Sequence, residues 1–69
     1  MNPAFIAAQF NTLLSSAHHI EDEYAYEQAA KHFSKELYAA GLINSRLSFL
    51  TACGVECPEK FGPFPGDTA

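Results

Sequence analysis

The stretch EDEYAYEQAAKHFSKELYAA occupies residues 21–40 and carries the strongest structural pattern in the chain. Its apolar side chains recur at the three- and four-residue steps of one helix face, and we expect them in a core: Tyr26, Ala29, Ala30, Phe33, Leu37 and Ala40. Acids fill what would be the first turn, where carboxylates interact well with a helix N-terminus. Gly41 follows as a natural C′ residue. We therefore predict a helix from about Glu21 to Ala40.

A second helix precedes this stretch. Asn2 is a good N-cap, and Pro3 sits at the helix position where its missing N–H costs nothing. An apolar stripe then follows at steps of four, three and four, made of Ile6, Phe10, Leu13 and Ala17. These features predict a helix from Pro3 to about Ala17. The segment from Ser15 to His19 includes no Gly or Pro, so either a short turn or a bend joins the two helices.

A third, shorter helix is predicted after Gly41. Asn44 can cap it, and Gly54 can end it, which gives a helix from about Ser45 to Cys53. Its apolar residues, Leu47, Phe49 and Leu50, would face the first two helices. The predicted fold class is therefore all-α: a helical hairpin closed by a short third helix.

The composition changes after Gly54. Residues 55–69 hold three prolines and two glycines, so we expect an irregular tail without regular structure. This divides the chain into a helical domain, residues 1–54, and a Pro/Gly-rich tail, residues 55–69. Phe61 and Phe64 distinguish the tail from a solvated linker, because each would gain free energy by docking on a groove of this chain or of a partner.

The length and charge of the chain limit its function. Its 69 residues form one small domain, since independent domains usually run from about 50 residues upward. A formal charge of −4 repels phosphate backbones and disfavours direct nucleic-acid binding. No apolar run approaches the roughly 18–20 residues of a membrane span, and the N-terminus lacks the positive region of a secretory signal. We therefore expect a cytoplasmic protein that binds no membrane.

The residues that could carry chemistry do not form a known constellation. The candidate metal ligands are His18, His19, His32, Cys53 and Cys57. Cys53 and Cys57 have the paired spacing of structural zinc sites by residue count alone, and adjacent His18 and His19 would point to different sides of a helix, so we expect no metal. No nucleophile turn, Gly-rich phosphate loop or set of convergent acids marks a catalytic site. We expect no enzyme activity, no cofactor and two free thiols.

The residues that remain point to contacts with another protein. Acids at the start of residues 21–40, two tyrosines off the apolar stripe and the two tail phenylalanines form the predicted partner-binding surface: Glu21, Glu23, Tyr24, Glu27, Tyr38, Phe61 and Phe64. Glu27 also precedes Lys31 by four residues on what we expect to be the outer helix face. A homodimer through residues 3–17 is expected as well, because one copy would leave part of Phe5, Phe10 and Leu14 uncovered.

About half of the chain carries a spaced set of residues that matches a known pattern: Ile20-Glu21, Tyr26, Ala29-Ala30, Phe33 in place of a tryptophan, Ala40, Asn44, Leu47 in place of a second tryptophan, and Cys53 close to a terminal cysteine. In these positions the chain resembles the ANR and PerC-like family of small regulators from Gram-negative bacteria. Tyr24 and Glu36 depart from the family pattern, and no arginine follows Leu47. The resemblance implies a small helical protein that modulates transcription by binding activators of the AraC type or nucleoid proteins of the H-NS type.

Two functions therefore compete. The first is a non-catalytic interaction module that regulates a transcription or nucleoid factor. The alternative is an acidic inhibitor from a phage or plasmid, which would block a host nucleic-acid-binding enzyme by presenting carboxylates to its basic groove. Direct DNA binding by a dimer is a third class, and Lys31, Lys35 and Arg46 are the only bases available to it in the helical region.

Overall fold

The computed structural model describes residues 2–64, which form three α-helices and one turn of 3-10 helix. Helix α1 spans Pro3–Ser16, α2 spans Ile20–Ala39, α3 spans Arg46–Ala52, and the 3-10 turn η1 spans Pro58–Phe61. The all-α prediction is confirmed, and each α-helix begins and ends within one residue of its predicted bounds. The last part of the predicted tail, residues 65–69, lies outside the described residues.

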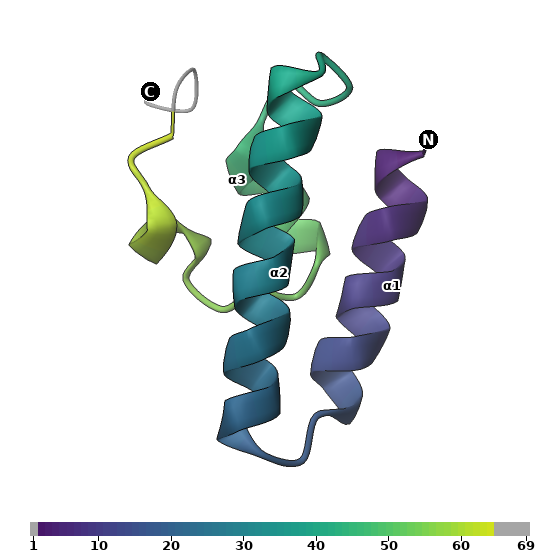
Figure 1. Ribbon diagram of the computed structural model, residues 1–69, viewed down its shortest axis with the longest axis vertical. Coiled ribbons are helices and arrows are strands. Elements are labelled where there is room, and N and C mark those ends of the chain that lie inside the picture. The colour runs from purple at the N-terminus through teal and green to yellow at the C-terminus, as the bar shows by residue number, and fades with distance from the viewer. Residues whose placement is uncertain (1, 65–69) are drawn as a thin grey trace.

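Helices α1 and α2 form an antiparallel hairpin, joined by a turn at residues 17–19 (Figure 1). A short turn, and not a bend in one long helix, therefore joins them. Helix α3 packs against both, and η1 packs against α3. In Figure 1 the tail that carries η1 lies on the other side of α2 from α1. Helix α2 is thus the central element, with a neighbour on each side.

Capping groups fix the helix ends. The Asn2 side chain accepts a hydrogen bond from the Ala4 N–H at 3.0 Å, so it is the predicted N-cap of α1. Helices α2 and α3 both end in a Schellman motif, in which a glycine adopts a positive φ: 76° at Gly41 and 89° at Gly54. In each motif the N–H two residues after the C-cap returns to a carbonyl of the last helical turn, from Leu42 to Leu37 and from Val55 to Leu50.

The N-cap of α3 differs from the prediction. Asn44 was a suitable residue for the position, but Ser45 holds it, and its hydroxyl accepts a hydrogen bond from the Ser48 N–H at 3.1 Å. Ser45 has the extended backbone that an N-cap residue requires. The prediction for Asn44 is therefore wrong by one residue.

The core combines residues from all three helices with residues from the predicted tail. Its buried members are Ala7, Phe10, Ala30, Leu37, Phe49, Leu50, Cys53, Val55 and Phe64. Because Val55 and Phe64 belong to this set, residues 55–64 pack into the same core as the helices. The expectation of no regular structure in the tail is also wrong for residues 58–61, which form η1.

Four apolar residues differ from their expected exposure: two expected in the core are exposed, and two expected to be partly uncovered are covered. Leu13 and Phe33 are both 39% exposed, because they stand at the edges of the α1–α2 contact and not at its centre. Phe10, expected to be partly uncovered without a second copy, is buried within this chain, and Leu14 packs against the core. Of the side chains that supported a homodimer, Phe5 alone stays largely exposed, at 63%.

The cap assignment at α3 can be tested by two neighbouring substitutions. Ser45→Ala removes the acceptor of the Ser48 N–H and is expected to lower the free energy of unfolding by about 1 kcal/mol. Asn44→Ala, an exposed position next to the cap, is expected to change it by less than about 0.5 kcal/mol. Urea unfolding followed by circular dichroism measures both values. Equal losses in the two variants would contradict the assignment.

Candidate interaction surface

The predicted partner-binding residues do not form one surface. Glu21, Glu23 and Tyr24 are exposed at the start of α2, and Tyr38 is half-buried near its end. Tyr24 and Tyr38 lie fourteen residues apart on one helix, which separates their backbones by about 21 Å. Tyr24 and the two acids can therefore act together, whereas Tyr38 belongs to a different region of the molecule.

Glu27 is buried, so its predicted place on the outer face is wrong. Its side chain is only 9% exposed, and its Oε1 accepts a hydrogen bond from the Lys60 Nζ at 2.8 Å. Lys60 comes from η1, 33 residues further along the chain. This hydrogen bond raises the pKa of the Lys60 ammonium above its ordinary value of 10.5. Glu27 thus joins the tail to α2 and does not face a partner.

The two tail phenylalanines dock on this chain. Phe64 is 4% exposed, and the Arg46 guanidinium carbon lies 4.7 Å from its ring centre. Phe61 is half-buried, and the Nζ atoms of Lys31 and Lys60 each lie 5.3 Å from its ring centre. These distances are typical of cation–π contacts. The sequence left open whether these side chains dock on this chain or on a partner. Phe64 docks on this chain.

A hollow that sequence reasoning missed lies along the α1–α2 hairpin. Five apolar side chains and one glutamine surround a cavity of about 220 Å³: Phe5, Ile6, Gln9, Phe10, Leu13 and Phe33. We call it the apolar hollow. Phe10 and Phe33 meet edge to face at its base, with ring centroids 5.5 Å apart. Phe5, Leu13 and Phe33 are its exposed apolar members. The available clue was the four-residue spacing of Phe5, Gln9 and Leu13, in which Phe5 and Gln9 lie beside the stripe assigned to the core and Leu13 belongs to it.

Carboxylates accompany the apolar hollow on α2. Asp22, Phe33 and Glu36 share one stripe of the helix, because their spacings of eleven and three residues each return nearly to the same face. Both acids are exposed. Glu36 is also 3.8 Å from the imidazole of His32, an exposed pair on the helix surface. The chemistry of this face is thus apolar at the hollow and acidic along the same helix stripe.

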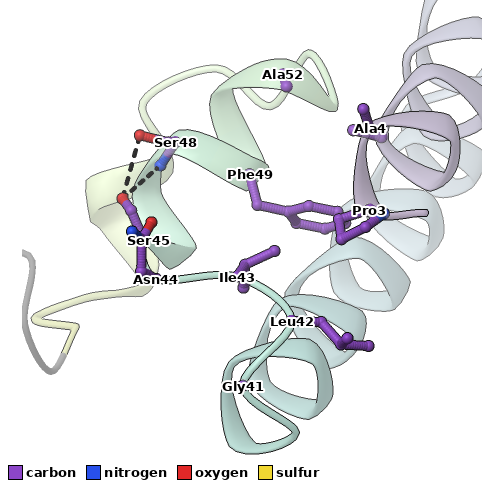
Figure 2. A pocket seen from close by; sticks show the side chains of 11 residues that line it. Pro3, Ala4, Gly41, Leu42, Ile43, Asn44, Ser45, Ser48, Phe49 and Ala52 are labelled. Carbon is purple, nitrogen blue, oxygen red and sulfur yellow. Dashed lines mark hydrogen bonds between the residues drawn. The ribbon is translucent and has the colours of Figure 1, made fainter. Parts of the chain in front are cut away.

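A larger cleft lies elsewhere, between the N-terminal half of α1, the α2–α3 loop and α3 (Figure 2). It has a volume of about 460 Å³. Pro3 and Ala4 of α1 line one side and Phe49 of α3 lines the other, with Leu42 on the loop. The hydroxyls of Ser45 and Ser48 bond to each other at 3.1 Å (Figure 2). The two hydroxyls therefore serve the α3 cap, and among residues 2–64 no titratable side chain lines the cleft.

The two cysteines differ in environment. Both are free thiols, as expected from the sequence. Cys53 is fully buried in the core, and burial raises the pKa of its thiol from 9.0 to about 11. Cys57 is exposed before η1, with a φ of 51°. A thiol reacts as its thiolate and only where a reagent can reach it. Cys53 is buried and Cys57 is exposed, so we expect Cys57 to be the reactive cysteine.

Within residues 2–64, no three His, Cys, Asp or Glu side chains approach closely enough to hold a metal ion. None of the helices in that range has the length and hydrophobicity of a membrane-spanning segment. Comparisons of the chain with protein-family models, curated proteins and solved structures found no match.

The bond between Lys60 and Glu27 predicts a pH dependence. Since the folded pKa of Lys60 lies above its unfolded value, the stabilisation is complete below about pH 10.5 and is lost as the pH rises through the folded value. Lys60 is partly exposed, so Glu27→Gln is expected to lower the free energy of unfolding at pH 7 by only about 0.5–1 kcal/mol. The difference from wild type should shrink above pH 10.5 in urea unfolding series.

Glu59→Gln is the matched control for that series, because Glu59 is an exposed acid in the same turn, η1. Its difference from wild type is expected to stay small and constant with pH. A Glu27→Gln difference that stays constant through the alkaline range would contradict the assigned hydrogen bond.

The cysteine environments predict unequal reactivity. At pH 8, a thiol reagent is expected to modify Cys57 in the native protein and Cys53 only after unfolding in urea, since the native Cys53 is buried and protonated. Cys57→Ser should therefore abolish the native reaction. A disulfide reagent that releases one coloured thiolate for each modified cysteine gives the number of reacted cysteines by absorbance. Rapid modification of Cys53 in Cys57→Ser would show that the core is open.

Proposed function

We propose that this chain is a non-catalytic protein-interaction module that acts in the cytoplasm and regulates a transcription or nucleoid factor. The observation that carries the proposal is the exposure of Phe5, Leu13 and Phe33 around the apolar hollow. Contiguous apolar side chains on a small domain are typical of surfaces that bind other proteins. The resemblance to the ANR and PerC-like family supports the class of partner.

The chemistry of the hollow describes the segment that binds it. A cavity of about 220 Å³ accepts one or two apolar side chains of a partner. Asp22 and Glu36, on the same stripe of α2 as Phe33, attract lysine or arginine on either side of those anchors. A partner segment with an apolar centre and basic flanks fits this surface. Proteins that bind nucleic acid carry many basic segments of this kind.

Phe5→Ser tests the proposal at the most accessible member of the hollow. Burying an aromatic side chain at an interface contributes about 1.5–3 kcal/mol, so the substitution is expected to weaken partner binding about tenfold or more. Ile20→Ser is the control, because Ile20 is also exposed, at 81%, but does not line the hollow. Tagged wild type and both variants are used for affinity purification from the native cell, and the captured partner is then titrated as a pure protein.

The proposal predicts a transcription or nucleoid factor that wild type and Ile20→Ser bind equally and that Phe5→Ser binds weakly. Capture of a nuclease or another nucleic-acid-processing enzyme would overturn it in favour of the acidic-inhibitor alternative. Analytical ultracentrifugation supplies a second criterion. A wild-type dimer that Phe5→Ser converts into a monomer would show that a second copy, and not a regulatory partner, covers the hollow.

A further inference from the structure

A basic pocket lies on the face of α2 away from the apolar hollow. It has a volume of about 250 Å³ and is lined by Gln28, Lys31, His32, Lys35 and Arg46. The whole chain has only four lysines and arginines, and three of them meet here. Within residues 2–64, no carboxylate lines the pocket. Positive charge is thus concentrated at one place on a protein whose formal charge is −4.

Arg46 is held in place from beneath. Its Nε donates a hydrogen bond to the Ser34 hydroxyl at 3.1 Å, and an Nη donates to the Lys31 carbonyl at 3.4 Å. The guanidinium also packs over the ring of Phe64, itself buried. Ser34 is fully buried and donates to the Lys31 carbonyl at 2.7 Å, which fixes the acceptor for Arg46. A cation fixed in this way loses little conformational entropy when it binds a ligand.

Helix geometry adds further donors beside Arg46. Gln28, Lys31 and Lys35 recur at steps of three and four residues, so their side chains share one face of α2. Lysine ammonium groups and the glutamine amide donate hydrogen bonds in several directions. His32 lines the same pocket, and its neighbour Glu36 is the carboxylate that competes for its imidazole. The pocket therefore offers mainly hydrogen-bond donors with three full positive charges.

We propose that the basic pocket binds the phosphate groups of a small phosphorylated molecule. Three cations in a compact space match an oxyanion with two or more charges, whereas one carboxylate would leave cations without a counter-charge. Guanidinium and ammonium groups are the side chains that bind phosphate most often. Duplex DNA fits less well, because it extends far beyond a pocket of this size and meets the repulsion of a net negative protein.

This site is independent of the apolar hollow. Lys35 and Phe33 are two residues apart on α2, which places their side chains about 200° apart around the helix. Ligand binding at the basic pocket can therefore be measured without a protein partner, and its outcome leaves the proposed function untouched.

The test uses the full chain, with pyrophosphate and metal-free ATP as the probes at physiological ionic strength. Isothermal titration calorimetry measures affinity, and amide chemical shifts locate the site. We expect saturable binding of both probes, with shifts centred on residues 28–35 and 46. Lys35→Gln removes an exposed ammonium from the pocket, and it is expected to weaken binding about tenfold. Equal affinities of the wild-type protein for pyrophosphate and ATP would show that the phosphate chain alone is recognised. Tighter binding of ATP would show an additional contact with the nucleoside.

Ala8→Glu is the control, because it changes the net charge by the same amount at an exposed α1 position outside the basic pocket. It is expected to retain wild-type affinity to within about twofold. Equal weakening in both variants would overturn the proposal, since only net charge would then matter. Failure of both probes to bind would also overturn it, as would binding of duplex DNA through Lys35 by a protein that does not bind pyrophosphate.

Discussion

The structure depends on two small residues of α2 that are completely buried. Ala30 and Ser34 expose no surface, and they lie one helical turn apart on the face that meets the rest of the core. A larger side chain at either position would push the neighbouring segments apart and break the close packing that protein interiors require. Ser34 adds a polar bond at this point, because its hydroxyl accepts from Arg46 at the start of α3.

Helix α2 also separates the two proposed activities. One stripe of the helix carries Phe33 with Asp22 and Glu36, and the opposite side carries Lys31 and Lys35. An amphipathic surface helix ordinarily has one apolar and one polar face. Here the polar face is itself divided by charge, with acids near the apolar hollow and bases near Arg46. A single helix can thus present an apolar, acidic surface to a protein and a basic pocket to a small anion.

The sequence predicted the helices well because their determinants are local. Periodic apolar residues and helix caps act within one or two helical turns. Asn2, Gly41 and Gly54 each act where they were expected. Asn44 and Ser45 are equally good caps in composition, so only the backbone path decides between them. Glu27 could not be placed, because a carboxylate is buried only with a partner, and Lys60 is 33 residues away. The apolar hollow was missed for a similar reason: Phe33 lies on the periodic stripe, yet the position of α1 leaves it at the edge.

Burial of Phe64 near the end of the chain has a consequence for where the protein can be cut. A boundary after Gly54, drawn from composition, would remove Val55 and Phe64 from the core and leave Glu27 without Lys60. The shortened protein would expose apolar core surface and leave the Glu27 carboxylate without its partner. Aggregation or nonspecific binding of such a fragment would therefore say little about the native protein. A fragment designed for expression should therefore include residues 55–64 together with the helices.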